Sequence, residues 1–239
     1  MFFAPTNLKK SLGGKMNEKM KRELATALQR LIESFSGICS FPIKGEIWEE
    51  LSVQALESIG VAADWDPGSH SPGADIMLPI LNEGISSKSG KITRTESTGR
   101  NDLKFSSYRT TQHETLKDKI DFFDGEGKNF ESYMVLSREE DEKGERRIYR
   151  VLLIDASKVN AEDIQWKENI SEKTKKQTGW GGECEKSGIK MIISKSMSDQ
   201  FWITLDLNKF DGYEVLFETS IPYDKLGKTH HITEKNDNA

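Results

Sequence analysis

Apolar residues recur at the 3.6-residue period of a helix in two segments near the start of the chain. The first segment predicts a helix over residues 16–36. The second predicts a helix from Gly45 to Ile59, which Gly60 ends as a C-terminal stop. A third helix is predicted to begin near Thr111, because Thr111 and Glu114 have the spacing of a capping box. The apolar stripe of the first helix consists of Met20, Leu24, Leu28, Leu31 and Ile32, and that of the third helix of Leu116, Ile120 and Phe123.

Short apolar runs between turn residues predict β-strands. Two of these runs, 74–79 and 85–92, read as a hairpin around the turn from Leu81 to Gly84. Helices before and after the strands indicate an α/β (α+β) fold with a central mixed β-sheet flanked by helices. Residues 1–224 are expected to form one domain with an N-terminal helical arm, and 225–239 a flexible polar tail. Five further strands are predicted at 133–137, 147–154, 188–194, 201–206 and 214–219, a short helix at 161–167, and loops at 61–71, 93–104 and 178–182.

The hairpin register predicts which side chains meet. It is expected to pair Met77 with Lys88 and Asp75 with Gly90. Side chains alternate between the faces of a sheet, and directly opposed residues share a face. Asp75, Ser86 and Lys88 are therefore expected to lie close together on one side. A carboxylate beside an ammonium group at a sheet rim can hold a divalent metal and steady a reacting phosphate. A cross-strand ion pair on a wet face is the alternative.

Composition narrows the class of protein. No run approaches the roughly 18 apolar residues that a membrane helix needs, and the first residues lack the pattern of a signal peptide. A cytoplasmic protein with no membrane association is therefore expected. Cys39 and Cys184 are far apart in the sequence, which fits a reducing compartment better than a disulfide framework. The glycine-rich segment 178–182 lacks a phosphate-loop lysine, so no nucleotide cofactor is expected.

The net charge of −5 conceals an uneven distribution of charge. Residues 86–119 contain eight basic and four acidic residues, so this segment carries +4 and the remainder of the chain −9. Basic charge concentrated directly after the hairpin favours contact with a polyanion. A solvated loop and helix face is the alternative.

Residues 45–123 resemble the PD-(D/E)XK nuclease superfamily, whose fold many type II restriction endonucleases share. In that family a helix that carries a glutamate precedes a β-hairpin. The first hairpin strand starts with Asp, and the second strand carries (D/E)-X-Lys. Asp75 matches the first position and Lys88 the last, but Ser86 stands where the family usually has Asp or Glu. Some restriction enzymes of the superfamily likewise have Ser-X-Lys and recruit the missing carboxylate from elsewhere. The resemblance implies a restriction endonuclease-like core.

Glu49 is the first candidate for the missing carboxylate. The segment from Gly45 to Leu51 resembles the helix start Gly-x-x-aromatic-Glu of the superfamily, which places the family glutamate on Glu49. On a helix Glu49 shares a face with Val53 and Leu56, and a carboxylate turned inward needs a partner such as a metal. Simple enrichment of acid at a helix N-terminus is the alternative. Three further acidic residues compete for the role: Glu50, Glu96 and Asp102.

The resemblance implies Mg²⁺ as the cofactor, held by Asp75, Glu49 and the backbone carbonyl of Ser87. The metal would polarise the scissile phosphate and activate a water molecule. Lys88 would orient that water and stabilise the negative charge that builds on the phosphorus. Ser86 would at most hydrogen-bond a water on the metal. The catalytic residues are thus expected to be Glu49, Asp75, Ser86 and Lys88.

Contacts to DNA are expected from the basic segment and from the residues that lead into the third helix. Helix N-termini bind phosphate readily, and arginine reads guanine. Ordinary helix capping is the alternative. The candidate DNA-binding residues are Arg94, Arg100, Lys104, Ser106, Ser107 and Arg109.

The resemblance implies a Mg²⁺-dependent, sequence-specific endonuclease of double-stranded DNA, a type II restriction enzyme. Cleavage of both strands of a palindrome implies a homodimer with two-fold symmetry. A repair or phage nuclease of the same fold is one alternative. A DNA-binding domain whose catalytic site has decayed at Ser86 is another.

Overall fold

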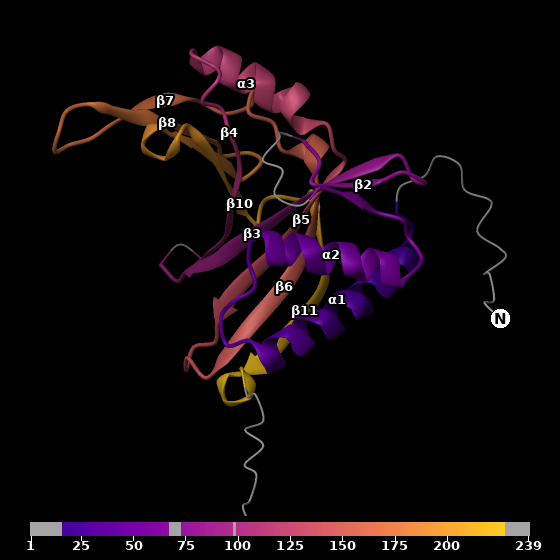
Figure 1. Cartoon of the computed structure of the whole chain (residues 1–239). Helices are drawn as coiled ribbons and strands as arrows, with labels where there is room; N and C mark the ends of the chain where they lie inside the picture. Colours follow the sequence, from indigo (N-terminus) through magenta and orange to yellow (C-terminus); the bar gives the residue numbers. More distant parts are fainter. Residues whose placement is uncertain (1–15, 67–72, 98, 228–239) are drawn as a thin grey trace, which may run out of the picture.

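The computed structural model describes residues 16–66, 73–97 and 99–227, which form a mixed α+β fold around one large sheet (Figure 1). The α-helices are α1 (Glu18–Ile38), α2 (Glu46–Ser58) and α3 (Leu116–Asp124). None of these helices is long and apolar enough to cross a membrane. The short 3₁₀-helices are η1 (Glu126–Lys128), η2 (Ala156–Lys158), η3 (Lys195–Met197) and η4 (Tyr223–Lys225). The strands are β1 (Asp64–Trp65), β2 (Ile76–Leu78), β3 (Glu83–Thr95), β4 (Arg100–Arg109), β5 (Ser132–Glu140), β6 (Arg146–Asp155), β7 (Lys167–Ile170), β8 (Gln177–Cys184), β9 (Ile189–Ser194), β10 (Gln200–Asp206) and β11 (Tyr213–Pro222).

The sheet has the strand order β11-β6-β5-β3-β4-β10-β9-β8-β7, and β2 pairs with β3 outside this path. The strand β1 pairs in turn with β2. Every pair is antiparallel except β3 with β5, which run parallel. A parallel pair needs a long connection, and here that connection contains β4 and α3. The predicted mixed sheet with flanking helices is thus confirmed at this level.

Helices α1 and α2 cover one face of the sheet over β3, β5, β6 and β11 (Figure 1). The predicted stripe of α1 supplies Leu24, Leu28 and Ile32, all with no exposed surface. From α2, Trp48 is equally buried, and its indole N–H donates to the carbonyl of Met134 on β5 at 3.1 Å. Burial of the apolar stripes is what holds both helices against the strands.

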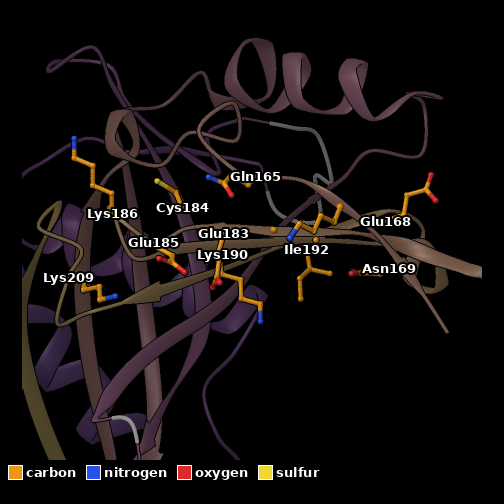
Figure 2. A pocket seen from close by; sticks show the side chains of 13 residues that line it. Gln165, Glu168, Asn169, Glu183, Cys184, Glu185, Lys186, Lys190, Ile192 and Lys209 are labelled. Carbon is orange, nitrogen blue, oxygen red and sulfur yellow. The ribbon is translucent and has the colours of Figure 1, made fainter. Parts of the chain in front are cut away.

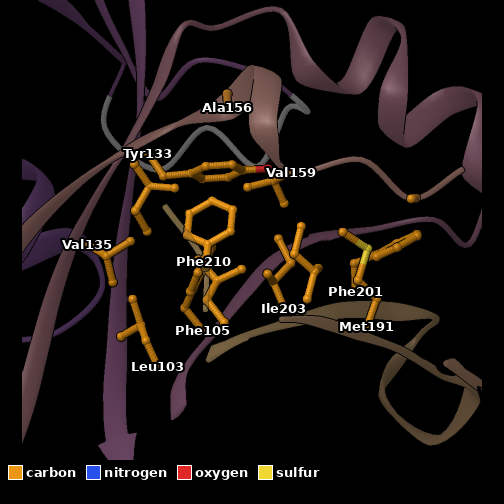
Figure 3. Close-up of a cluster of buried hydrophobic side chains, with 14 of the residues drawn as sticks. Leu103, Phe105, Tyr133, Val135, Ala156, Val159, Met191, Phe201, Ile203 and Phe210 are labelled. Carbon is orange, nitrogen blue, oxygen red and sulfur yellow. The ribbon is translucent and has the colours of Figure 1, made fainter. Parts of the chain in front are cut away.

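The opposite face carries a second core, which α3 covers (Figure 3). Phe123 of α3 stacks on Phe201 of β10 with ring centroids 4.6 Å apart. Phe105 of β4 meets Tyr133 of β5 edge to face at 5.3 Å. The two cores lie on the two faces of the same strands, so residues next to each other in a strand belong to different cores.

The prediction of a loop over residues 93–104 is wrong. β3 continues to Thr95, and β4 begins at Arg100. Leu103 and Phe105 are buried on either side of the exposed Lys104. This alternation is the signature of a half-buried strand, and the charged residues of the exposed face masked it.

The third helix starts later than predicted. Its cap is Thr115 and not Thr111, and Asp118 completes a capping box in which each side chain bonds the other residue's backbone. The pair Thr111 and Glu114 has the same spacing, but both residues lie in the irregular segment that precedes the helix. Of the predicted stripe, Phe123 is buried, and Leu116 and Ile120 are partly buried against the same core.

Two further predictions downstream are also wrong. Residues 161–167 do not form a helix, and the glycine-rich segment is not a loop but part of β8. At Gly179, which has φ of +149°, an added Cβ would lie 1.9 Å from the carbonyl oxygen of Ile193. Glycine here allows the backbones of β8 and β9 to approach each other, which is a recognised reason for glycine within a strand.

The first residues of the predicted tail belong to the fold. Leu226 packs against the core beneath α1, and the N–H of Gly227 donates to the carbonyl of Ser36 at 3.0 Å. The rest of that tail, residues 228–239, and the start of the predicted N-terminal arm, residues 1–15, lie outside the described residues.

Candidate active site

The β2–β3 hairpin differs in register from the prediction. Met77 pairs with Gly84 instead of Lys88, a shift of four residues, because the turn begins two residues earlier than expected. A shift by an even number of residues leaves every side chain on its original face. Asp75, Ser86 and Lys88 therefore share a face in spite of the wrong register.

These three side chains meet at the carboxylate of Asp75. Its Oδ2 accepts hydrogen bonds from Lys88 Nζ at 2.6 Å and from Ser86 Oγ at 3.0 Å. The side chains of Lys88 and Asp75 are only 17% and 16% exposed. At this depth their attraction is screened much less than that of a surface ion pair. The aspartate is thus held in one orientation by two donors from β3.

The site lies where two strands part from the same edge of β3. The pairing with β2 ends at Ile85, and the pairing with β4 begins at Gly90. Between these positions β3 keeps its parallel partner β5 on the other edge. Within the described ranges, no strand pairs with this stretch of β3 on the β2 and β4 side. The backbone polar groups of that edge are therefore available to a ligand or to water.

Ser87 presents its main chain to this gap. The carbonyl of Ile85 accepts from the N–H of Asp75 at 3.0 Å, so Ile85 directs its polar backbone groups toward β2. Backbone groups two residues apart in a strand point to the same edge, which places those of Ser87 in the gap. The side chain of Ser87 lies on the opposite face of the sheet, and its buried hydroxyl has no hydrogen-bond partner among the described residues. The carbonyl is therefore the group of Ser87 that serves the site.

Glu49 reaches the same site from the first turn of α2. Its Oε2 accepts a long hydrogen bond of 3.4 Å from Trp65 Nε1. Glu49 and Asp75 line one cavity of about 310 Å³. Burial raises the pKa of the Glu49 carboxyl, and the charge of Asp75 raises that pKa further, against the opposing effects of Trp65 and Lys88. Two carboxylates thus face a shared space, and a cation would be favoured there.

The competing carboxylates lie elsewhere. Glu50 is exposed and accepts from the side-chain amide of Gln54 at 3.2 Å. Asp102 pairs with Arg100 at 3.2 Å. Glu96 follows the far end of β3, and at about 3.3 Å per residue it is more than about 20 Å along the strand from Lys88. Of the four candidates, only Glu49 is beside Asp75.

Sequence reasoning missed the contribution of β1 to the site. Residues 61–71 were predicted to be a loop, but Asp64 and Trp65 form a short strand that pairs with β2. Asp64, Trp65 and Asp66 line the cavity with Glu49 and Asp75. The only local signal for this strand was the alternation Asp64-Trp65-Asp66. That pattern does not reveal that the indole of Trp65 would contact α2. Within residues 16–66, 73–97 and 99–227, no group of three or more His, Cys, Asp or Glu side chains is arranged to hold a metal ion.

The predicted DNA-binding residues differ in their surroundings. Two of the arginines are engaged in ion pairs, Arg94 with Glu139 at 3.4 Å and Arg100 with Asp102. The hydroxyl of Ser107 is buried. The remaining candidates are more accessible: Lys104 and Arg109 are exposed, and Ser106 is partly exposed.

Comparison of the chain with protein-family models, with curated proteins and with solved structures found no match. The geometry of the site is therefore the basis for any assignment of function.

Proposed function

We propose that this protein is a Mg²⁺-dependent endonuclease that hydrolyses phosphodiester bonds of double-stranded DNA, in the manner of a type II restriction enzyme. The observation that carries the proposal is the shared carboxylate of Asp75. It binds Lys88 and Ser86 at the open edge of β3 and lines a cavity with Glu49. A restriction endonuclease-like core and a cytoplasmic location are parts of the same proposal.

The donor groups at the site fit Mg²⁺. The carboxylates of Asp75 and Glu49 and the backbone carbonyl of Ser87 are hard oxygen ligands of the kind that this ion prefers. The raised pKa of Glu49 supports this fit, because a divalent cation would offset both the burial of its carboxylate and the charge of Asp75. When bound, Mg²⁺ supplies Lewis-acid polarisation of the phosphate and activation of water.

The protein's own groups perform the remaining work. Lys88 Nζ has three donors, of which one is used on Asp75, so the ammonium can also orient a water toward the phosphate. The same positive charge stabilises the charge that develops on the phosphoryl oxygens. Ser86 stands where the resemblance leads one to expect a carboxylate. Its hydroxyl instead donates a hydrogen bond that orients the carboxylate of Asp75. Glu49 supplies the second carboxylate from α2.

A homodimer follows from the proposed class and not from any contact in the structure. Two-fold symmetry would give one active site for each strand of a palindromic sequence. Mass measurement in solution, with and without a DNA duplex, tests this part of the proposal.

Digestion of phage DNA tests the function itself. The protein is incubated with the DNA and Mg²⁺, with a matched reaction in EDTA, and the products are separated by size. Discrete bands that need Mg²⁺ are expected. A smear would instead indicate a nuclease without sequence preference, such as a repair or phage enzyme. Intact DNA at every enzyme concentration would refute the nuclease and favour a decayed site.

A further inference from the structure

A row of basic side chains crosses the middle of the sheet. Lys91 of β3 lies directly beside Arg138 of β5 on one edge and Lys104 of β4 on the other. The row continues through Thr204 of β10 to Lys190 of β9. Neighbouring strands are about 4.8 Å apart, so the row brings four cations within about 20 Å. Arg138, Lys91, Lys104 and Lys190 are called the basic strip below.

The strip lies on the face opposite to the core that α3 covers. The strand neighbours of its lysines, including Leu103, Phe105 and Met191, are buried in that core. Lys91, Lys104 and Lys190 are themselves exposed. The core beneath α1 and α2 includes Ile85 near the start of β3 but no residue of β4, β9 or β10, and the helices do not extend over β10 and β9 (Figure 1). Figure 2 shows Lys190 projecting from β9 on the side away from α3.

The charges of the strip are not neutralised within the described residues. None of its four side chains makes an ion pair there, in contrast to Arg94 and Arg100. Lys104 Nζ instead lies 4.9 Å from the centroid of the Trp202 ring. At the far end, Glu183 of β8 is opposite Lys190 but forms no such pair. Like charges directly opposed across strands destabilise a sheet. A row of this kind therefore indicates a surface kept for an external anion.

We propose that the basic strip binds the phosphate backbone of DNA, outside the site at Asp75. The choice of DNA as the polyanion rests on the proposed function. The spacing of the cations supports it, because a nucleic-acid strand carries one charge per about 3.4 Å of helix axis, close to the separation of neighbouring strands. Lys91 lies three residues from Lys88, so their side chains project from opposite faces of β3 and the strip is a contact surface separate from the site.

A lipid surface is a poorer match to the strip. Proteins that lie on membranes combine basic residues with apolar side chains that enter the lipid. The large exposed apolar side chains of the described residues are elsewhere: Ile38, Phe41, Met77, Ile80, Ile170, Met197 and Val215. On the same face, Lys104 and Thr204 are flanked by Ser106 and Trp202 on one side. On the other side they are flanked by Asp102 and Asp206, which both lie beside Arg100.

Binding of a fluorescein-labelled DNA duplex in EDTA tests the strip without any need for cleavage. The double variant Lys91→Gln/Lys104→Gln is compared with the wild type over a range of salt concentrations by fluorescence anisotropy. We expect its Kd to rise at least about tenfold, and the slope of log Kd against log salt to fall by about 2, because two phosphate contacts are lost. The matched control Lys19→Gln/Lys117→Gln removes the same charge from α1 and α3, and should bind like the wild type.

The variant Lys91→Arg/Lys104→Arg separates charge from structure, since it should retain the wild-type salt slope. An unchanged Kd and slope in the glutamine variant would overturn the strip as a DNA surface, even if the enzyme cuts DNA. Binding that depends on the strip without any digestion would keep the strip and refute the nuclease. Sedimentation with phosphatidylserine vesicles is the third arm. Vesicle binding that needs Lys91 and Lys104, with no DNA binding, would overturn the proposal in favour of a lipid surface.

Discussion

Lys88 and Lys91 lie three residues apart on one strand, yet their surroundings are opposite in character. Lys88 is 17% exposed and contacts Asp75 at 2.6 Å. Lys91 is exposed on the other face, where its nearest neighbours across the sheet are Arg138 and Lys104. The difference arises because Lys88 lies in the gap between the β2 and β4 pairings, whereas Lys91 is paired with β4 and, at an odd spacing, faces the other side of the sheet. A paired, half-buried ammonium suits contact with a reacting group, whereas unpaired exposed charges suit attraction of a polyanion.

The largest expected difference between Lys88 and Lys91 is in the rate of DNA cleavage by their variants. Lys88→Ala and Asp75→Ala should each reduce the rate at saturating DNA by at least about 100-fold, because each removes charge stabilisation from the reaction itself. Lys91→Ala should instead raise the DNA concentration that gives half-maximal rate. Initial rates of plasmid cleavage over a range of DNA concentrations distinguish these effects. The control is Lys117→Ala on α3, an exposed lysine whose loss should leave the rates unaltered. Retained cleavage in the Asp75 or Lys88 variant would overturn the site.

A smaller effect is expected on stability. Asp75→Ala leaves the Lys88 ammonium half-buried without its carboxylate. A lost partner of this kind costs about 1–3 kcal/mol, and each kcal/mol lowers Tm by about 2–4 °C in a chain of this size. Lys91→Gln should change stability by less than about 0.5 kcal/mol, since it removes an exposed and unpaired charge. Thermal unfolding of both variants at one pH measures the contrast. Equal shifts in Tm would show that the two lysines do not differ in the way described.

The weakest effect is the pH dependence of stability that Glu49 contributes. Its folded pKa is raised by burial and by Asp75, so the folded state favours the protonated form. Stability from this group is therefore present at low pH and falls as pH rises from the ordinary glutamate value near 4.3 through the raised value. Glu49→Gln should remove this fall, and its Tm should exceed that of the wild type at neutral pH.

Addition of Mg²⁺ sharpens the same measurement. The ion should raise the Tm of the wild type more than that of Glu49→Gln, because one carboxylate of the donor set has been removed. The same increase in both proteins would exclude Glu49 from cation binding, without reference to activity.

Local sequence was sufficient for α1 and α2 and for part of the site. The stripe of Leu24, Leu28 and Ile32 predicted α1, since a helix is encoded by residues three and four apart. The common face of Asp75 and Lys88 was also predicted correctly although the register was wrong. Strand faces depend only on whether the shift is even or odd, so the error of four residues did not separate them.

Pairing between distant segments was not predictable in this way. β4 and β8 escaped recognition because one face of each is polar, and their strand character depends on partners far along the chain. The surroundings of Asp75 likewise depend on segments that are distant in the sequence. Glu49 was chosen by resemblance, but its contact with Trp65 and its cavity shared with Asp75 depend on how β1 and α2 pack.

The amino-acid sequence by itself thus determined α1 and α2, the alternation of side chains in the hairpin and the presence of basic charge after it. Only the tertiary structure decided that Glu49 shares a cavity with Asp75 and that Lys91 lies in a row of unpaired cations. The physical reason is that periodicity acts between near neighbours, whereas the environment of a charge depends on the strands that are placed beside it.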